Sequence, residues 1–153
     1  MTATGRASGS AAVALSALHH FLESPSIDLL RQVLGLTPSG AVRLVDRLAA
    51  DGLVRRTAGA DGRQVAVALT AKGRRAAAAV AGARARVLSD ALGDLSAEER
   101  RVLDRLVGRL LVGQLRGPGA TRWTCRLCDT KACGRLEGRC PLANASGALP
   151  RGD

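Results

Sequence analysis

Residues 35–56 read GLTPSGAVRLVDRLAADGLVRR, and this stretch decides the fold. Its first residue, Gly35, suits a tight turn. Thr37 supplies a side-chain oxygen that caps a helix, and Pro38 fits the first helical position, where its missing N–H is not needed. Apolar residues then recur at helical spacing: Ala41, Leu44, Val45 and Leu48. The stretch therefore predicts a turn followed by a helix that ends near Ala50.

Two helices are predicted upstream of this turn. Residues 10–22 place Ala11, Leu15, Leu18 and Leu22 on one helical face. Ser24 and Pro25 end that helix, because proline cannot continue it. Ser26 then caps a second helix that ends near Leu34. Helix, glycine turn and helix together predict a helix-turn-helix.

A β-hairpin is predicted downstream. Residues 53–56 are short and strand-like, and residues 58–62 are a Gly- and Ala-rich turn. In residues 65–69, Val and Leu alternate with Ala, as in a half-buried strand. A two-stranded wing after a helix-turn-helix is the winged helix-turn-helix arrangement.

Two long helices and a tail complete the chain. Thr70 caps an Ala-rich helix that runs to about Leu92, and Ser96 with Glu99 forms a capping box at the start of the next helix. That last helix carries a wide apolar stripe: Val102, Leu103, Leu106, Val107, Leu110 and Leu111. The Gly-Pro-Gly at residues 117–119 ends it.

We therefore predict a mainly α protein with one small β-hairpin, in three parts. Residues 10–75 form a winged helix-turn-helix DNA-binding domain. Residues 76–116 form a helical dimerisation region. Residues 117–153 form a Cys-rich tail that binds a metal or a cluster.

The composition excludes several classes of protein. The 153 residues amount to about one domain, and 46% hydrophobic residues suffice for a buried core. No stretch approaches the roughly 20 apolar residues of a membrane-spanning helix. The apolar run at residues 11–18 is too short for a secretory signal. We therefore expect a cytoplasmic protein with no membrane partner. Phe21 and Trp123 are the only aromatic residues, so the core is left to Leu, Val and Ala in closely packed helices.

The charge is strongly basic and unevenly distributed. Lys and Arg number 23 against 13 Asp and Glu, a net charge of +10, and only Lys72 and Lys131 are lysines. Residues 37–75 alone hold eight basic and three acidic residues. Half of the excess therefore lies in the predicted helix-turn-helix and wing, where arginine forks suit phosphate and guanine. This concentration favours double-stranded DNA as the partner.

Specific residues can be assigned to DNA. Four residues face away from the apolar side of the helix after the glycine turn: Ser39, Gly40, Arg43 and Arg47. Ser39 and Gly40 lie near its N-terminus, where backbone N–H groups attract phosphate. Arg43 is the best candidate for a bidentate contact to guanine. Arg63, at the wing tip, suits a narrow minor groove. Predicted phosphate contacts are Arg55, Arg56 and Lys72.

Five short motifs stand out in about residues 26–75. They are Gly35-Leu36-Thr37-Pro38-Ser39, Val42-Arg43-Leu44-Val45-Asp46-Arg47-Leu48, Gly52-Leu53-Val54-Arg55-Arg56, Asp61-Gly62-Arg63 and Leu69-Thr70. Together they resemble the MarR family of bacterial transcription regulators. The resemblance implies a homodimer on a palindromic operator, with the third helix in the major groove and Arg63 in the minor groove. It also implies that Asp46 helps to hold the arginine side chains, and Asp61 receives a supporting role in the wing motif.

The chain departs from that family in three ways. Only one helix precedes the helix-turn-helix where the family usually has two, so we expect dimerisation on the last two helices, or else an N-terminus that lies upstream of Met1. Arg31 stands where helix-turn-helix motifs usually have a small residue. The family does not generally carry a Cys-rich tail.

The tail holds every cysteine of the chain: Cys125, Cys128, Cys133 and Cys140. A DNA-binding regulator works in a reducing cytoplasm, which disfavours a disulfide framework. The Cys-x2-Cys pair suits one metal, and turns at Gly134 and Gly138 let the other two cysteines fold back to complete the shell. We therefore predict a metal or cluster site, with a thiol/disulfide switch as the alternative.

The bound group stays open between an iron–sulfur cluster and zinc. Structural zinc often uses two Cys-x2-Cys pairs, whereas this tail has one. A final Cys-Pro is similar to the ferredoxin pattern, and residues 140–144 are similar to the end of the cluster segment in SoxR-type redox regulators, with different inner spacing. Either group with four thiolates carries about −2. Four nearby cations are candidates to offset this charge: Arg126, Lys131, Arg135 and Arg139. Trp123 is expected to pack the tail onto the body.

The expected function is that of a dimeric MarR-like transcription regulator, a repressor whose four-Cys site senses redox or metal status. The alternative is a regulator that responds to a small-molecule effector and uses the tail as a structural zinc site. An enzyme is not expected, because no thioredoxin-like βαβ pattern surrounds Cys125 and Cys128 and no His–carboxylate pair is evident.

Overall fold

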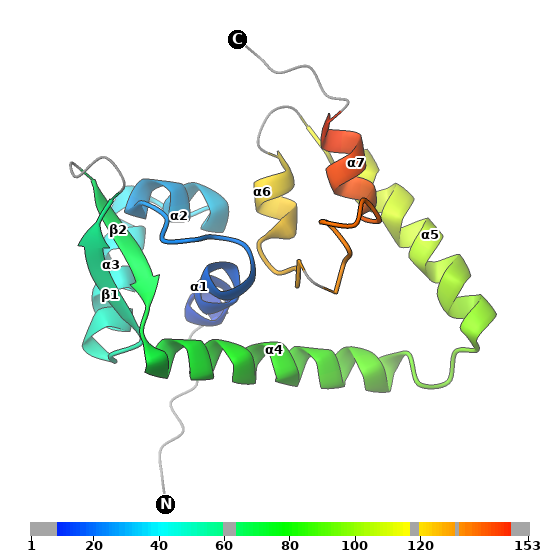
Figure 1. The fold of residues 1–153 in the computed structure, drawn as a ribbon, viewed down its shortest axis with the longest axis horizontal. Coiled ribbons are helices and arrows are strands. Elements are labelled where there is room, and N and C mark those ends of the chain that lie inside the picture. The colour runs from blue at the N-terminus through cyan, green and yellow to red at the C-terminus, as the bar shows by residue number, and fades with distance from the viewer. Residues whose placement is uncertain (1–8, 60–63, 117–119, 131, 148–153) are drawn as a thin grey trace, which may run out of the picture.

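A computed structural model describes residues 9–59, 64–116, 120–130 and 132–147. In chain order its elements are α1 (Gly9–His20), α2 (Ile27–Leu34), α3 (Pro38–Ala50), β1 (Val54–Ala58), β2 (Val65–Leu69), α4 (Ala71–Ala91), α5 (Ala97–Gly113), α6 (Ala120–Cys125) and α7 (Pro141–Gly147) (Figure 1). The predicted mainly helical fold with one small hairpin is confirmed. The short helices α6 and α7 in the tail were not anticipated.

The helix-turn-helix forms for the predicted local reasons. The Ser26 hydroxyl accepts the Leu29 N–H (3.1 Å) and so caps α2. Gly35 follows α2 with φ 65°, a left-handed conformation that favours glycine. Arg31 causes no packing conflict, because its side chain turns outward and donates to Asp28 (2.8 Å). The helix is therefore free to pack through its apolar face.

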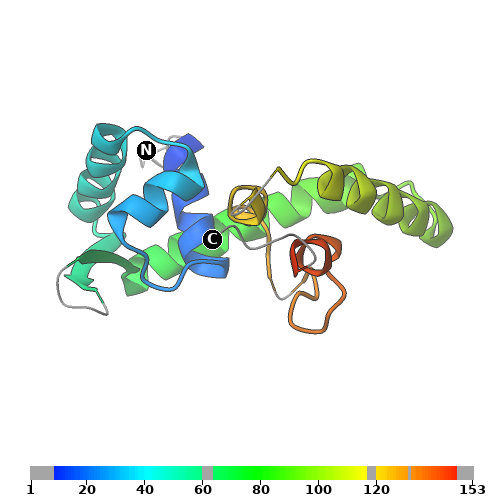
Figure 2. The same cartoon turned by 90° about the horizontal axis from the view of Figure 1, so that it is seen from above.

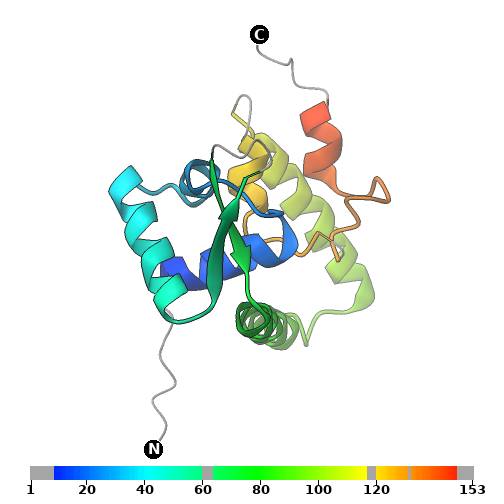
Figure 3. The same cartoon turned by 60° about the vertical axis from the view of Figure 1, so that its left-hand side comes forward.

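The wing is an antiparallel hairpin that is tied to the loop before α2. Its register pairs Val54 with Leu69 at the base, and Figure 3 shows the hairpin beside α3. The Val67 N–H donates to the Pro25 carbonyl (2.9 Å), and Ala66 bridges to Ser26. Ala66 is therefore buried, although strict alternation along the strand would expose it. A second neighbouring segment, which local periodicity does not reveal, covers that side of β2.

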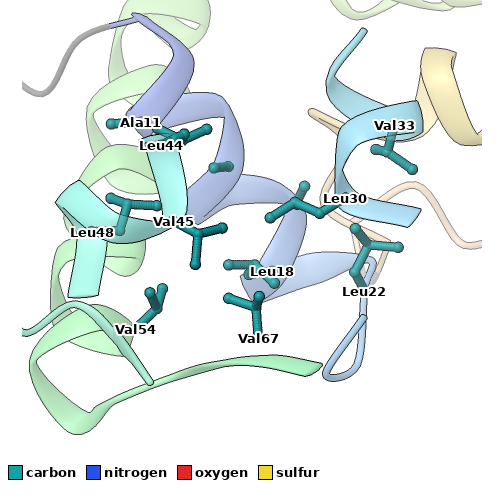
Figure 4. Close-up of a cluster of buried hydrophobic side chains, with 12 residues drawn as sticks. Ala11, Leu18, Leu22, Leu30, Val33, Leu44, Val45, Leu48, Val54 and Val67 are labelled. Carbon is teal, nitrogen blue, oxygen red and sulfur yellow. The ribbon is translucent and has the colours of Figure 1, made fainter. Parts of the chain in front are cut away.

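We call α2, α3 and the hairpin the reading head, and its core is built on α1. Figure 4 shows its buried side chains, among them Leu18, Leu30, Val45, Leu48 and Val67. Leu30, Val45 and Val67 have 0% exposure, and each such side chain contributes about 1.5–3 kcal/mol relative to exposure. The fold therefore depends on aliphatic packing between close helices.

Helix α1 is buried on more sides than its sequence predicts. Five consecutive residues are buried: Ala14, Leu15, Ser16, Ala17 and Leu18. The helix contacts α2, α3, α4 and β2, and its alanines allow these close approaches. A one-sided apolar face was expected, but neighbours on several sides leave α1 with little exposed surface.

Helix α4 runs under the reading head and continues past it, and α5 turns back from its far end (Figures 1 and 2). The tail lies in the angle between the reading head and α5, where α6 contacts α2 and α7 contacts α5. Several large apolar residues of α4 and α5 remain exposed: Val87, Leu88, Val102, Leu103, Leu106, Val107 and Leu110. Within the described ranges, none of the helices combines the length and apolar character that a membrane crossing requires.

Candidate nucleic-acid interface and cysteine site

The outer face of α3 presents the predicted base-reading residues. Ser39, Arg43 and Arg47 are exposed, and Gly40 is half-buried. The opposite face holds the helix in the core: Ala41, Leu44, Val45 and Leu48 are buried there. The Gly40 N–H donates to the Thr37 hydroxyl (3.1 Å), so the cap already uses this amide, which had been predicted to attract phosphate. The predicted DNA contact of α3 is therefore left to its side chains.

An ion pair connects α3 to the wing. The Arg56 guanidinium on β1 donates to the Asp46 carboxylate on α3. Both side chains are partly exposed, so the pair contributes at most about 1 kcal/mol to stability. Its main effect is to orient Arg56 beside the recognition helix. Asp46 thus has the partner that the resemblance implied.

Arg55 lies on the other face of β1, because neighbouring strand residues point to opposite faces. It lines a hollow of about 380 Å³ together with His19 and Arg74. Lys72 lies at the far end of α3, where its ammonium donates to the Asp51 carbonyl (2.8 Å). The structure therefore brings Arg56 to the exposed residues of α3 but places Arg55 and Lys72 elsewhere.

Two predicted wing residues, Asp61 and Arg63, lie outside the described residues.

The second candidate site is a cavity of about 490 Å³ between the tail and α5. All four cysteines line it: Cys125, Cys128, Cys133 and Cys140. Gly134 (φ 64°) and Gly138 (φ 69°) make the left-handed turns that return the chain from Cys133 to Cys140. All four thiols are free. The predicted fold-back of the tail is thus confirmed.

The thiols contact one another in two pairs. A hydrogen bond in which Cys125 donates to Cys128 raises the pKa of Cys125, and burial raises it further. The same bond lowers the pKa of Cys128 to about 6, aided by the charges of Arg84 and Arg135. Burial raises the pKa of Cys133, and the contact of this thiol with Cys140 adds to the rise. One thiol of the site is therefore poised to ionise more easily than its neighbours.

Two of the four cations predicted around the thiols lie at the cavity. Arg135 and Arg139 line the cavity, and the Arg135 guanidinium donates to the Cys125 sulfur (3.9 Å). Arg126 instead lies over the Trp123 ring, 3.5 Å from its centroid, so its predicted role beside the thiols is not seen. Lys131 lies outside the described residues. Among the described side chains, no three His, Cys, Asp or Glu converge closely enough to grip one metal ion in this arrangement.

The tail also binds the rest of the molecule through contacts that sequence reasoning missed. Arg84 of α4 donates to the Leu127 carbonyl and lies 3.5 Å from the buried Ser16 hydroxyl. Thr130 donates to the His20 carbonyl at the end of α1 (2.7 Å). The one available signal was an arginine on the apolar face of an Ala-rich helix. The Trp123 ring packs against Gly35, which confirms that Trp123 packs the tail onto the body.

Comparisons with known proteins agree with this geometry. Residues 8–64 match a family model described as "MarR family". The fold is similar to a MarR family protein from Bacillus stearothermophilus, with 29% identity over 69% of this chain and 74% of that one, at a TM-score of 0.64. A probable transcriptional regulator from Pseudomonas aeruginosa has 29% identity over 67% of this chain and 77% of that one, at 0.51.

Likeness of fold alone extends to the MepR–DNA complex of Staphylococcus aureus, with 19% identity over 70% of this chain and 79% of that one, at 0.55. No curated protein matches the chain.

Proposed function

We propose that the chain is a MarR-type transcription regulator, not an enzyme, that binds a palindromic operator in double-stranded DNA as a homodimer. Residues 8–64 match the MarR family model, and the fold is similar to that of a MarR family protein. One observation carries the proposal. The exposed face of α3 presents Arg43 and Arg47 beside an Arg56 that Asp46 orients. A helix face with oriented arginines suits the major groove.

The contacts divide by role. Arg43 reads guanine, since its planar fork matches the O6 and N7 acceptors. Arg47 and Arg56 bind phosphate and fix the register of the helix on the duplex. Arg63 of the wing enters the minor groove, in keeping with the resemblance. This division predicts that the loss of Arg43 changes sequence preference, whereas the loss of Arg56 weakens all DNA alike.

The homodimer is proposed to form through α4 and α5. Leu88 is 56% exposed, and Leu106 and Leu110 on α5 are 49% and 69% exposed. Large exposed apolar side chains of this kind, gathered on two helices, suit an interaction surface. A second copy of the chain fits it, because two-fold symmetry of the protein then mirrors the palindrome of the operator.

We propose further that the regulator is a cytoplasmic repressor whose four-Cys site senses redox or metal status. The four-Cys site contacts both the proposed dimer helix α5 and the turn before α3. Its cavity is lined by Leu111 of the proposed dimer helix α5, and its Trp123 packs on the turn before α3. A change at the thiols would therefore alter the spacing of the two recognition helices in the dimer. Operator affinity depends on that spacing.

A second candidate function is regulation by a small-molecule effector, with the cysteines as a structural zinc site. The support for an effector is the size of the cavity, since about 490 Å³ lies in the range of ligand pockets; this size says nothing of zinc. In that case an effector would change operator affinity, whereas an oxidant would not.

Selection of duplexes from a random-sequence pool tests the DNA proposal, with a palindromic consensus as the expected result. The selected duplex then serves to measure operator affinity with and without an oxidant or a chelator. Wild type should respond, Cys128→Ser should not, and Leu136→Ser, at a tail position with 89% exposure, should respond like wild type. An unchanged response in Cys128→Ser contradicts the sensing proposal, and a lack of any selected sequence contradicts operator binding.

A further inference from the structure

The four thiols of the tail share one cavity, and its dimensions bear on what they hold. We infer that they bind an iron–sulfur cluster and not a single zinc ion. The inference rests on the proposed function, because it names the group through which the four-Cys site would sense redox or metal status.

The cavity that the thiols line has room for more than one ion. In a structural zinc site four sulfurs lie about 2.3 Å from one ion and leave no further space between them. Here the four thiols line, together with residues of α5 and the tail, a cavity of about 490 Å³, which has room for a group larger than one ion. A group with several metal atoms and bridging sulfides keeps its four cysteine ligands further apart than one ion does.

The pairing of the thiols is the second observation. Cys125 contacts Cys128, and Cys133 contacts Cys140, so the cysteines form two pairs on two segments of the tail. The first pair lies at the C-terminal end of α6, and the second is brought together by the turns at residues 134–138. Two pairs suit a group that offers more than one metal atom, with each pair on its own iron.

The chemical surroundings suit an anionic cluster. Four thiolates around a cluster core of charge 2+ leave about −2 in total. Arg135 donates to the Cys125 sulfur, and Arg135 and Arg139 both line the cavity. N–H donors to the sulfurs and nearby cations stabilise such a charge. These cations also fit other anions, so they support the cluster only together with the volume and the pairing.

Burial protects the site. Cys125 and Cys140 are 3% and 6% exposed, and Leu142 beside them is 4% exposed. On the other side, Gly108 of α5 packs so closely on Pro141 that a Cβ there would lie 3.2 Å from the proline ring. Restricted access of solvent slows oxidative loss of a cluster and tunes its potential. The cavity thus combines sulfur ligands with an apolar cover.

The experiment uses the full chain, purified without oxygen and then supplied with ferrous iron and sulfide, or with zinc alone. Iron, acid-labile sulfide and zinc are counted per chain, and the visible absorption spectrum is recorded. We expect a brown protein that holds iron and sulfide in equal amounts. Cys133→Ser and Cys140→Ser should lose most of this iron. Leu136→Ser should retain it, since that side chain is 89% exposed and does not line the cavity.

A variant of Arg135 tests the contribution of its charge to cluster binding. Arg135→Gln keeps a polar, unbranched aliphatic stem but removes the charge and the guanidinium donors, and it should hold the cluster roughly tenfold more weakly. Unfolding curves show whether each variant folds. The iron, sulfide and zinc counts of the wild-type protein test the inference even if a variant does not fold.

A colourless wild-type protein with one zinc per chain, or with no bound metal, overturns the inference. Retention of full iron by both Cys133→Ser and Cys140→Ser also overturns it. Operator binding of the same preparations, measured on the selected duplex, is a separate readout. A protein that binds its operator but assembles no cluster contradicts this inference alone. A protein that assembles the cluster but selects no operator contradicts the proposed function alone.

Discussion

Trp123 of the tail packs on Gly35, the glycine at the turn between α2 and α3. The contact is so close that a Cβ on Gly35 would lie 2.6 Å from Cζ3 of the indole. Gly35 also has φ 65°, so both its backbone conformation and its neighbour favour glycine. The tail is therefore in direct contact with the element that positions the recognition helix.

Substitution of Gly35 should be unusually costly because of this contact. Gly52 is a matched control, since it has φ 68° but only Lys72 Cδ, at 4.0 Å, near its Cβ position. We expect Gly52→Ala to lose about 1–2 kcal/mol from the left-handed backbone. Gly35→Ala should lose more, because the ring must also move. Chemical denaturation of both variants measures the difference.

The same pair of variants in a Trp123→Ala background isolates the ring. There the excess cost of Gly35→Ala over Gly52→Ala should largely disappear, as in a double-mutant cycle between touching residues. An excess that persists without the indole would mean that the ring is not its cause.

Helix α4 offers a second matched pair of glycines. A Cβ on Gly73 would lie 1.8 Å from the Leu53 carbonyl oxygen, whereas Gly82 has only the flexible Arg86 end at 3.8 Å. Gly82→Ala should stabilise the protein by about 0.5–1 kcal/mol, because alanine loses less backbone entropy in a helix. Gly73→Ala should destabilise it by roughly 1–3 kcal/mol or more through overpacking. Thermal unfolding would contradict the close approach if both variants gained stability.

Arg43→Ala should remove base reading from α3. We expect a loss of about 1–3 kcal/mol on the selected operator and a relaxed preference at one position of each half-site. Titration of the specific duplex and of random duplex by fluorescence anisotropy measures both effects. Equal losses on the two duplexes would assign Arg43 to phosphate instead.

Arg56→Ala should weaken specific and random DNA by similar factors and lower the salt dependence of binding. Arg55→Ala is the matched control one residue away, on the opposite face of β1, and should cause a smaller loss. Binding over a range of salt concentrations gives the slope for each variant. A larger effect of Arg55→Ala would mean that the other face of the hairpin meets the duplex.

Leu110→Arg should weaken the proposed dimer, because it places a charge in an apolar face where the leucine is 69% exposed. Leu136→Arg is the control, since it adds the same charge at a tail position with 89% exposure. Sedimentation velocity of both variants gives the oligomeric state. A monomeric wild type, or an unchanged dimer in Leu110→Arg, would refute an interface at this face.

Much of the fold was predictable because its signals are local. The caps at Ser26, Thr37 and Thr70 and the capping box at Ser96 all lie next to the helices that they start, and each forms as predicted. The hairpin was predictable from its alternation and turn. The outward face of α3 followed from helical periodicity alone, so the exposure of Arg43 and Arg47 was also predictable.

Other features depend on which segments meet. The burial of Ala66 depends on the loop before α2, and the burial of Ser16 depends on α4. Arg84 lies in an Ala-rich helix, and only the tertiary structure shows that it links α4 to the Leu127 carbonyl. Arg55 and Arg56 are adjacent in sequence, but their side chains lie on opposite faces of β1.

The sequence by itself determined the helix-turn-helix, the wing, the recognition face and the set of four cysteines, because these arise from spacing within one segment. Only the tertiary structure decided that the thiols line one cavity beside α5 and that Trp123 reaches Gly35. The Trp123–Gly35 contact joins residues 88 positions apart, and the cavity brings several elements together. Their geometry depends on how whole helices pack, and no local pattern carries that information.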